Sequence, residues 1–438
     1  MADEYYQPVS RLFLLSIAQN LIPHILAITT SKGALLRYLC VPFMIWIFSL
    51  MLHPVRNPSH ITSLFATTAW FNILSALDLL LLNPKEADDF VAINEGTSRV
   101  KSFFNGLRTA LKQHLNSRKI NTPEEAKNTP PMPAYYTQKN GKNASKPISR
   151  RRYLIRETAI AMWQYLVLDI STSQAVKTGL SKNEQQQQQQ QNASVGGSWV
   201  ELGIEQIIVA IAAWFIVGRI VIGFTYRLVA VVSVGLRFEA PEEYPPLFSK
   251  MADAYTLRNF WGKFWHQLLR IKFTAISNYI TRDVFGLAKS SFPERYTQVF
   301  CVFLLSGILH LTADVVGNIP MGESGAMVFF LSFVLGYMIE DGVQAVWKKR
   351  FQGSATSEAG STNSQKEPEM WKKVLGYIWV LAYLTVTSAV YFEPVRKRPE
   401  RQLALVPWSF VEVIGLEMMG ALVVVGGVLL MVVFEVEV

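Results

Sequence analysis

The residues best suited to chemistry lie in one apolar run, residues 299–316, with the sequence VFCVFLLSGILHLTADVV. Ser306, His310 and Asp314 recur there every four residues, so in a helix they share one face that is otherwise surrounded by apolar side chains. Ionisable groups are costly at membrane depth and normally mark a working site. A neutral imidazole can take the proton of a hydroxyl as the hydroxyl attacks a carbonyl carbon. We therefore predict His310 as a general base, with Ser306 or Asp314 orienting its ring.

A second unusual segment, residues 258–270, reads RNFWGKFWHQLLR. If the segment is one helix, the residues at four-residue spacing share one stripe: Arg258, Gly262, His266 and Arg270. The residues that flank this stripe are Trp261, Lys263, Trp265 and Gln267. Cations and large rings on one surface favour a flat anionic ligand such as a nucleotide. The same composition is typical of a membrane interface, where Trp is enriched and the side chains of Lys and Arg extend their charged groups into water.

A third polar stripe lies within the apolar run 325–347, at intervals of three, four and seven residues: Tyr337, Glu340, Asp341 and Gln344. We expect the two carboxylates to pair with Arg258 or Lys263 as a scaffold rather than to react. An acyl transfer passes through an oxyanion that needs hydrogen-bond donors. The candidate donors are His266, Trp261 and Gln344, which the sequence does not rank.

These three segments together resemble the wax-synthase-like branch of the membrane-bound O-acyltransferase superfamily. The matching motifs are F-W-G-x-x-W-H-Q-x-x-R at 260–270, S-G-x-x-H at 306–310, and the apolar helix with a carboxylate pair at 329–344. The resemblance implies that His310 is catalytic. It also implies that His266 occupies a position often taken by asparagine, as a base partner or an acyl-CoA contact.

The resemblance further implies an acyl-CoA co-substrate and no bound cofactor or metal. The residues expected to contact acyl-CoA are Arg258, Trp261, Lys263, Trp265 and Arg270. Fungal members of this branch often acetylate hydroxyls of terpenoids or meroterpenoids, whereas plant members make wax esters from long-chain alcohols. The amino-acid sequence of the FWGKFWHQ segment resembles the fungal members more than the plant members, which favours acetyl-CoA as the donor.

The composition predicts an all-α, polytopic membrane protein with about eight or nine transmembrane helices plus interfacial amphipathic helices. Half of the 438 residues are hydrophobic and only 17% are charged, against about 25% in soluble domains. The mean hydropathy is +0.21. Long apolar runs must cross a bilayer as helices, because a helix satisfies its own backbone. The net charge of +9 lies mainly in the connections, which indicates contact with anionic lipid rather than nucleic acid.

Along the chain we expect six regions. They are N-terminal spans (1–82), a basic cytosolic loop with an amphipathic helix at 91–115 (83–152), middle spans with a low-complexity polyglutamine loop at 171–198 (153–236), the wax-synthase-like catalytic region (237–347), a flexible linker (348–373) and C-terminal spans (374–438). Within 203–236 we expect one span followed by an interfacial helix. Asn143 and Asn192 each match a glycosylation motif on opposite predicted sides, so at least one is idle.

Two other interpretations compete with acetyl transfer in the endoplasmic reticulum membrane to a lipophilic alcohol. One is a wax synthase. The other is a proton-coupled transporter in which Ser306, His310, Asp314 and Glu340 relay protons, although the hydropathy shows no internal repeat. The sequence contains no H-E-x-x-H, no C-x-x-C and no Gly-rich phosphate loop. Cys40 and Cys301 lie in apolar runs, which argues against a disulfide framework. The oligomeric state is left open.

Overall fold

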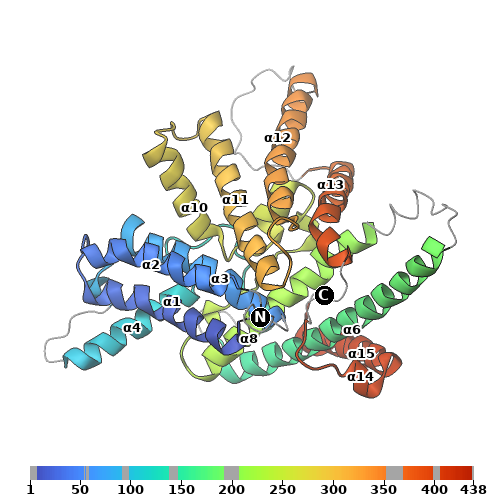
Figure 1. The fold of residues 1–438 in the computed structure, drawn as a ribbon, viewed down its shortest axis with the longest axis horizontal. Coiled ribbons are helices and arrows are strands. Elements are labelled where there is room, and N and C mark those ends of the chain that lie inside the picture. Colours follow the sequence, from blue (N-terminus) through green and yellow to red (C-terminus); the bar gives the residue numbers. More distant parts are fainter. Residues whose placement is uncertain are drawn as a thin grey trace.

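The computed structural model describes residues 7–53, 55, 59–90, 98–137, 147–191, 207–351, 368–397 and 405–436. Within these ranges the chain is helical and has no strand, as predicted (Figure 1). Seven helices of the described part are long and apolar enough to cross a membrane. They are α1 (Val9–Thr29), α3 (His60–Leu77) with its π-helical end Asp78–Leu82, residues 207–235 ending in α8 (Gly218–Gly235), α11 (Phe292–Val316), α12 (Ala326–Phe351), α13 (Met370–Lys397) and α15 (Leu416–Phe434). The protein is therefore a multi-pass membrane protein.

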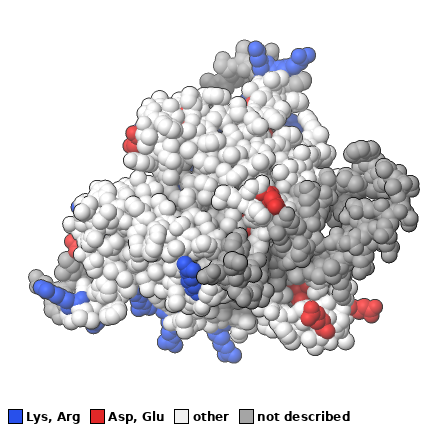
Figure 2. All heavy atoms as spheres, in the orientation of Figure 1, with Lys and Arg blue, Asp and Glu red and all other residues white. Residues whose placement is uncertain are grey.

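The remaining helices are shorter or more polar. They are α2 (Leu35–Met51), α4 (Arg99–Leu115), α5 (Ala134–Thr137), α6 (Arg150–Gln191), α9 (Leu257–Asn259), α10 (Arg270–Asn278) and α14 (Val411–Ile414), with π-helical turns at Ala212–Val217, Phe260–Phe264 and Tyr279–Val284. The prediction of eight or nine spans is higher than seven because it also counted α2 and residues 153–170 of α6 as spans. Figure 2 shows a broad uncharged face, with Lys and Arg gathered along the lower edge and at the upper end of α12.

Helix α11 is central, because it packs against α3, α10 and α12 (Figure 1). On one side, α1 and α2 pack on α3; on another, α13 packs on α12. Helices α8 and α15 both pack on α6. An aromatic core joins the turn Ala212–Val217, the segment around Phe260, and helices α11, α12 and α13. The predicted catalytic helix therefore lies inside the bundle with neighbours on several sides.

Three charged residues of α6, Arg156, Glu157 and Asp169, have partners inside the protein, which explains how this helix packs in the bundle. Glu157 accepts from Arg156 at 2.6 Å and pairs with Arg227 of α8 at 3.0 Å. Asp169 is fully buried and accepts the Ser409 hydroxyl at 2.6 Å and the Phe410 backbone N–H at 2.7 Å. Pairing of this kind is what permits ionisable groups to enter a membrane bundle.

Three predictions of local structure are wrong. Residues 207–235 form one continuous helix rather than a span and an interfacial helix, because Arg227 finds a partner and does not end the span. The polyglutamine run 185–191 is not a loop but the last part of α6, since Gln is a good helix former and extends an existing helix at little cost. The predicted last span, 410–434, is broken at Gly415, whose φ of +81° separates α14 from α15.

Other boundaries are close to the predictions. The amphipathic helix expected at 91–115 is α4, which begins at Arg99 and leaves Val100 and Phe104 exposed; residues 91–97 lie outside the described ranges. The two ends of the predicted linker 348–373 are helical, in α12 and α13. Asn143 and Asn192 are also outside the described residues.

Candidate active site

Helix α11 carries Ser306, His310 and Asp314, and its ends are well defined by the sequence. The Ser291 hydroxyl caps its first turn by accepting the Glu294 backbone N–H at 3.2 Å, and a proline occupies the first turn. Gly307, in the S-G-x-x-H motif, lets α12 approach closely, because a Cβ there would lie 2.8 Å from the sulfur of Met327. The S-G-x-x-H motif therefore supplies His310 and, through Gly307, allows α12 to pack close to the helix that carries it.

His310 is half-buried between α11, α12 and α13. Its ring stacks on Phe330 of α12, with centroids 4.5 Å apart and an interplanar angle of 23°. Its Nδ1 atom lies 3.0 Å from the hydroxyl oxygen of Tyr391 on α13. Tyr391 in turn stacks on Phe329, at 5.1 Å and 23°. The imidazole is thus held by contacts with two neighbouring helices of the bundle.

The ring partner differs from the predicted one. Asp314 accepts a hydrogen bond from the Ser324 hydroxyl at 2.5 Å, so its side chain serves the connection between α11 and α12 instead of the imidazole. Ser306 is half-buried one turn before His310, and among the described residues the group bonded to the ring is Tyr391. Sequence reasoning missed Tyr391 because no spacing links it to His310; its only signal was a polar hydroxyl near the end of an apolar run.

The segment 258–270 is not one helix. Its α-helical start, α9, passes into the π-helical turn Phe260–Phe264, and Trp265 is extended, with φ −71° and ψ 152°. Gln267 donates to the backbone oxygens of Trp261 and Trp265, at 3.1 and 2.5 Å. These bonds satisfy carbonyls near the end of the turn and compensate for the helical bonds that the break removes. The predicted stripe at four-residue spacing is therefore absent.

Arg270 stabilises the same break. Its guanidinium donates to the Gly262 backbone oxygen at 3.1 Å and to the Gln267 side chain at 2.8 Å. Burial lowers the pKa of Arg270. The Gln and Arg of the motif F-W-G-x-x-W-H-Q-x-x-R thus hold the motif's own backbone. The prediction that Arg270 binds acyl-CoA stays a prediction, and its observed contacts are internal.

The aromatic residues of this segment pack into the core beside His310. Trp261 lies between several rings, 5.9 Å from Phe330, 5.1 Å from Phe333 and 5.7 Å from Trp265. Trp265 is buried. Phe330 therefore contacts both Trp261 and His310, which brings the first two predicted segments together around one ring.

Two buried polar atoms in this region have no hydrogen-bond partner within the described part of the chain. They are Nε1 of Trp261 and Nδ1 of His266. Burial, and then the neighbouring His310, lower the pKa of His266 to about 3, so the ring is neutral at physiological pH. Leaving a buried polar group unpaired costs about 1–3 kcal/mol. A ligand that bonds to these atoms would remove that cost.

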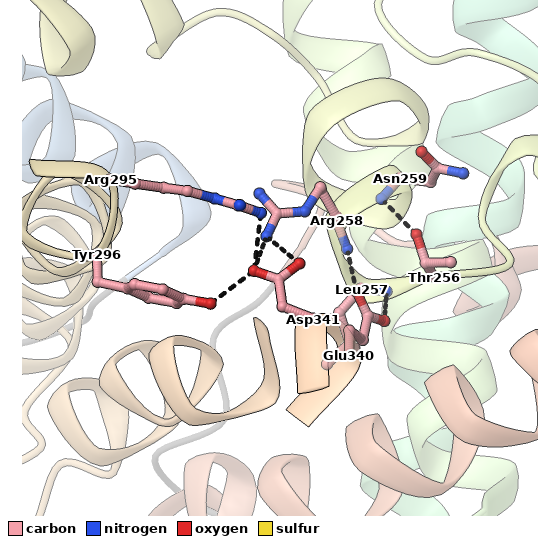
Figure 3. A network of polar contacts seen from close by, with 8 residues as sticks. All are labelled: Thr256, Leu257, Arg258, Asn259, Arg295, Tyr296, Glu340 and Asp341. Atoms are coloured by element: carbon pink, nitrogen blue, oxygen red, sulfur yellow. Dashed lines mark hydrogen bonds and ion pairs between the residues drawn. The ribbon is translucent and has the colours of Figure 1, made fainter. Parts of the chain in front are cut away.

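The carboxylate pair of α12 organises a separate network (Figure 3). Glu340 accepts the backbone N–H groups of Leu257 and Arg258, the latter at 3.2 Å, and the Trp379 indole N–H at 3.0 Å. It thereby fixes the start of α9 against α12 and α13. Glu340 is buried, with 6% of its surface exposed, so it is a structural acceptor for orphan N–H groups at a helix start.

Asp341 joins α9, α11 and α12. It accepts two bonds from Arg258, at 3.0 and 3.1 Å, one from Arg295 at 2.7 Å and one from the Tyr296 hydroxyl at 2.6 Å (Figure 3). The predicted pairing of Arg258 with a carboxylate of this helix is confirmed. Arg258 also lies 4.6 Å from the Tyr337 ring.

The other predicted residues are on the outside. Gln344 is exposed on α12 and Lys263 is exposed on the π-helical turn. Gln344 is therefore not among the buried donors near His310, whereas Trp261 and His266 are. No group of three or more His, Cys, Asp or Glu suited to a metal ion occurs among the described residues.

The comparisons with known proteins agree with this arrangement. The pattern of the membrane bound O-acyl transferase family matches residues 244–332, which contain both the FWGKFWHQ segment and His310. The acetyltransferase atnC of Arthrinium sp is 34% identical to this chain over 435 residues, covering 97% of this chain and 96% of that protein. This chain belongs to the membrane-bound O-acyltransferase family.

Two further relatives extend the likeness. The acetyltransferase spyB of Aspergillus fumigatus is 32% identical over 96% of this chain and 70% of its own length. The acetyltransferase TRI7 of Fusarium sporotrichioides is 31% identical over 93% of this chain and 91% of its own length. No solved structure matches. The protein is thus a membrane-bound acyltransferase, with acetyl transfer favoured, and the comparisons decide against the transporter interpretation.

Proposed function

We propose that this protein transfers the acetyl group of acetyl-CoA to a hydroxyl of a lipophilic terpenoid or meroterpenoid, with His310 as general base. The observation that carries the proposal is the position of the imidazole, between the Phe330 ring and the Tyr391 hydroxyl and near two buried nitrogens that have no partner among the described residues. Acetyltransferase relatives over nearly the whole chain support the donor. The aromatic surroundings favour a lipophilic acceptor over a charged one.

In the proposed reaction, Nδ1–H of His310 donates to Tyr391, which leaves the lone pair on Nε2 free. Nε2 takes the proton of the acceptor hydroxyl as the hydroxyl oxygen attacks the thioester carbonyl. The tetrahedral oxyanion collapses, the carbon–sulfur bond breaks, and the departing CoA thiolate takes the proton from the imidazolium. The products are the acetyl ester and CoA, and His310 returns to its neutral form.

The oxyanion needs donors, and we assign this role to Trp261 and His266. An indole N–H can only donate. Nε1 of Trp261, which has no acceptor in the described part of the chain, therefore suits a developing negative charge. His266 is neutral and carries one N–H of its own. Gln344 is dropped from the predicted donors because it is exposed. We place the reaction in the endoplasmic reticulum membrane, with acyl-CoA arriving from the cytosol.

The test uses microsomes that contain the full chain, either labelled acetyl-CoA or a labelled long-chain acyl-CoA, and a panel of polycyclic terpenoid alcohols beside long-chain alcohols. We expect acetyl esters of the polycyclic alcohols, and a loss of about 100- to 10,000-fold in His310→Ala. His53→Ala is the control, since His53 is exposed. Equal product from wild type and His310→Ala would remove the proposed base. Product only from fatty alcohols and long-chain acyl-CoA would assign the protein to wax synthesis instead.

A further inference from the structure

A cavity of about 370 Å³, lined by none of the residues of the candidate active site, lies between α1, the end of α3, the segment 83–90, α4, the segment 116–124 and α10. Three lysines line it: Lys85, Lys119 and Lys272. Its size is within the range of small-ligand pockets. The residues come from six parts of the chain, so the fold itself gathers these ammonium groups around one space.

Within the described part of the chain, two of the three lysines form ion pairs at the cavity and Lys85 forms none. Lys272 pairs with Asp78 at 2.5 Å, and Lys119 pairs with Glu124. Lys85 donates to the neutral side chain of Gln113 at 2.8 Å. Burial, and then the charges of Lys119 and Lys272, lower the pKa of Lys85, against a smaller opposing effect of Asp89 and Glu124. The three ammonium groups therefore repel one another across the cavity, and an anion between them would relieve this repulsion.

The other polar wall is neutral. His114 of α4 meets His24 of α1 edge to face, with centroids 4.9 Å apart. Burial, followed by His24 and Lys272, lowers the pKa of His114 to about 3, so it adds hydrogen-bonding capacity without charge. The remaining lining includes the amides of Asn83 and Asn116. An anion in the cavity would thus meet three ammonium groups, two of them already paired with the carboxylates of Asp78 and Glu124, and several neutral polar groups.

The cavity is accessible from outside the spans. Glu124, on its wall, has a side chain that is 70% exposed, and Lys119 is 35% exposed. Helix α4 beside it presents Val100 and Phe104 outward, 65% and 61% exposed, as expected for a helix at a membrane surface. A ligand would therefore reach the lysines from water or from the lipid headgroup region.

We propose that this cavity binds a phosphate monoester, held by Lys85, Lys119 and Lys272. A phosphate monoester carries a charge of about −1.5 to −2 and three strong acceptor oxygens. Its three oxygens can each accept from one ammonium group, whereas a carboxylate has only two oxygens. The phosphate can belong to a soluble nucleotide, such as the 3′-phosphate of CoA, or to a phospholipid headgroup. The proposal does not depend on the proposed acetyl transfer, because the binding is measured without catalysis.

The experiment uses the full chain in nanodiscs of phosphatidylcholine. In one arm, equilibrium dialysis measures binding of adenosine 3′,5′-bisphosphate, the nucleotide end of CoA. In the other, phosphatidic acid is added to the nanodiscs and the melting temperature is recorded. We expect one or both probes to bind, and Lys85→Gln to weaken binding by about tenfold or more. Bisphosphate binding identifies a soluble source of the phosphate, and phosphatidic acid binding identifies a lipid source.

Matched variants separate binding from folding. Lys85→Arg keeps the charge and should retain binding. Lys101→Gln removes an exposed lysine of α4 outside the cavity and should bind like the wild type. The double variant Asp78→Asn with Lys272→Gln removes an ion pair without leaving a lone charge, and should also weaken binding. Failure of both probes to bind the wild type, or binding that Lys85→Gln leaves unchanged, overturns the proposal.

Discussion

The hydroxyl oxygen of Tyr391 lies 3.0 Å from Nδ1 of His310, although the two residues are 81 positions apart in the chain. The contact joins α13 to α11 across α12, whose Phe330 stacks on the imidazole. A histidine whose Nδ1 is engaged in this way has its ring orientation and its tautomer set by the partner. The position of α13 therefore determines how the imidazole is presented.

Removing the Tyr391 hydroxyl should slow the reaction without disturbing the bundle. We expect Tyr391→Phe to lower kcat about fivefold, the equivalent of one net hydrogen bond of about 1 kcal/mol. KM for acetyl-CoA should stay unchanged. The matched control is Tyr383→Phe, which removes another hydroxyl of α13, one that donates to the Ser332 backbone at 2.6 Å. If both variants lose activity equally, Tyr391 has no special relation to His310.

Gly325 sets the distance between the start of α12 and the end of α13. A Cβ at this position would lie 2.2 Å from the Val390 backbone oxygen and 2.9 Å from the Cα of Tyr391. Gly325→Ala should therefore push α13 away and lower activity at least as much as Tyr391→Phe. Gly322→Ala is the control, because a Cβ there meets nothing within 4 Å. Steady-state rates of the two variants, measured at equal folded protein, check this; equal rates would contradict it.

The sequence predicted the helical class and most spans because long apolar runs leave a membrane protein few alternatives. It also predicted that the carboxylates of residues 340 and 341 pair with Arg258 or Lys263, and the pair that forms is Arg258–Asp341. His310 could be singled out as an ionisable group inside hydrocarbon.

Contacts between distant helices could not be predicted in this way. Tyr391 approaches His310 only because α12 and α13 pack with a given register, and periodicity within one helix contains no information about that register. The helix predicted for 258–270 failed for a different reason: Gln267 offers the backbone an alternative to helical bonds, and such competition depends on geometry that spacing alone does not fix.

Glu340 should stabilise the folded protein through the backbone N–H groups that it accepts. In Glu340→Gln the amide group can present N–H donors to the backbone N–H groups of Leu257 or Arg258, which the carboxylate now accepts. An unsatisfied buried donor costs about 1–3 kcal/mol, so the melting temperature should fall by several degrees. Glu417→Gln, at an exposed position of α15, should leave it unchanged. Thermal unfolding in detergent distinguishes the two, and equal melting temperatures would show that Glu340 is not a structural acceptor.

The lowered pKa of His266 predicts how the stability of the protein depends on pH. The folded pKa is about 3, against about 6.5 in an unfolded chain. Below pH 6.5 the unfolded chain therefore binds a proton that the folded protein does not, so stability is lost as the pH falls from 6.5 toward 3. At about pH 5 the loss from this one residue amounts to about 2 kcal/mol.

His266→Asn removes this titration and should flatten the pH dependence. The fall in melting temperature between neutral pH and about pH 5 should be smaller in His266→Asn than in the wild type. His114 has a similarly lowered pKa and is present in both proteins, so its contribution cancels in the comparison. His53→Asn, at an exposed position, should retain the full wild-type fall. If His266→Asn loses as much stability on acidification as the wild type, then the His266 ring is not kept neutral by its burial beside His310.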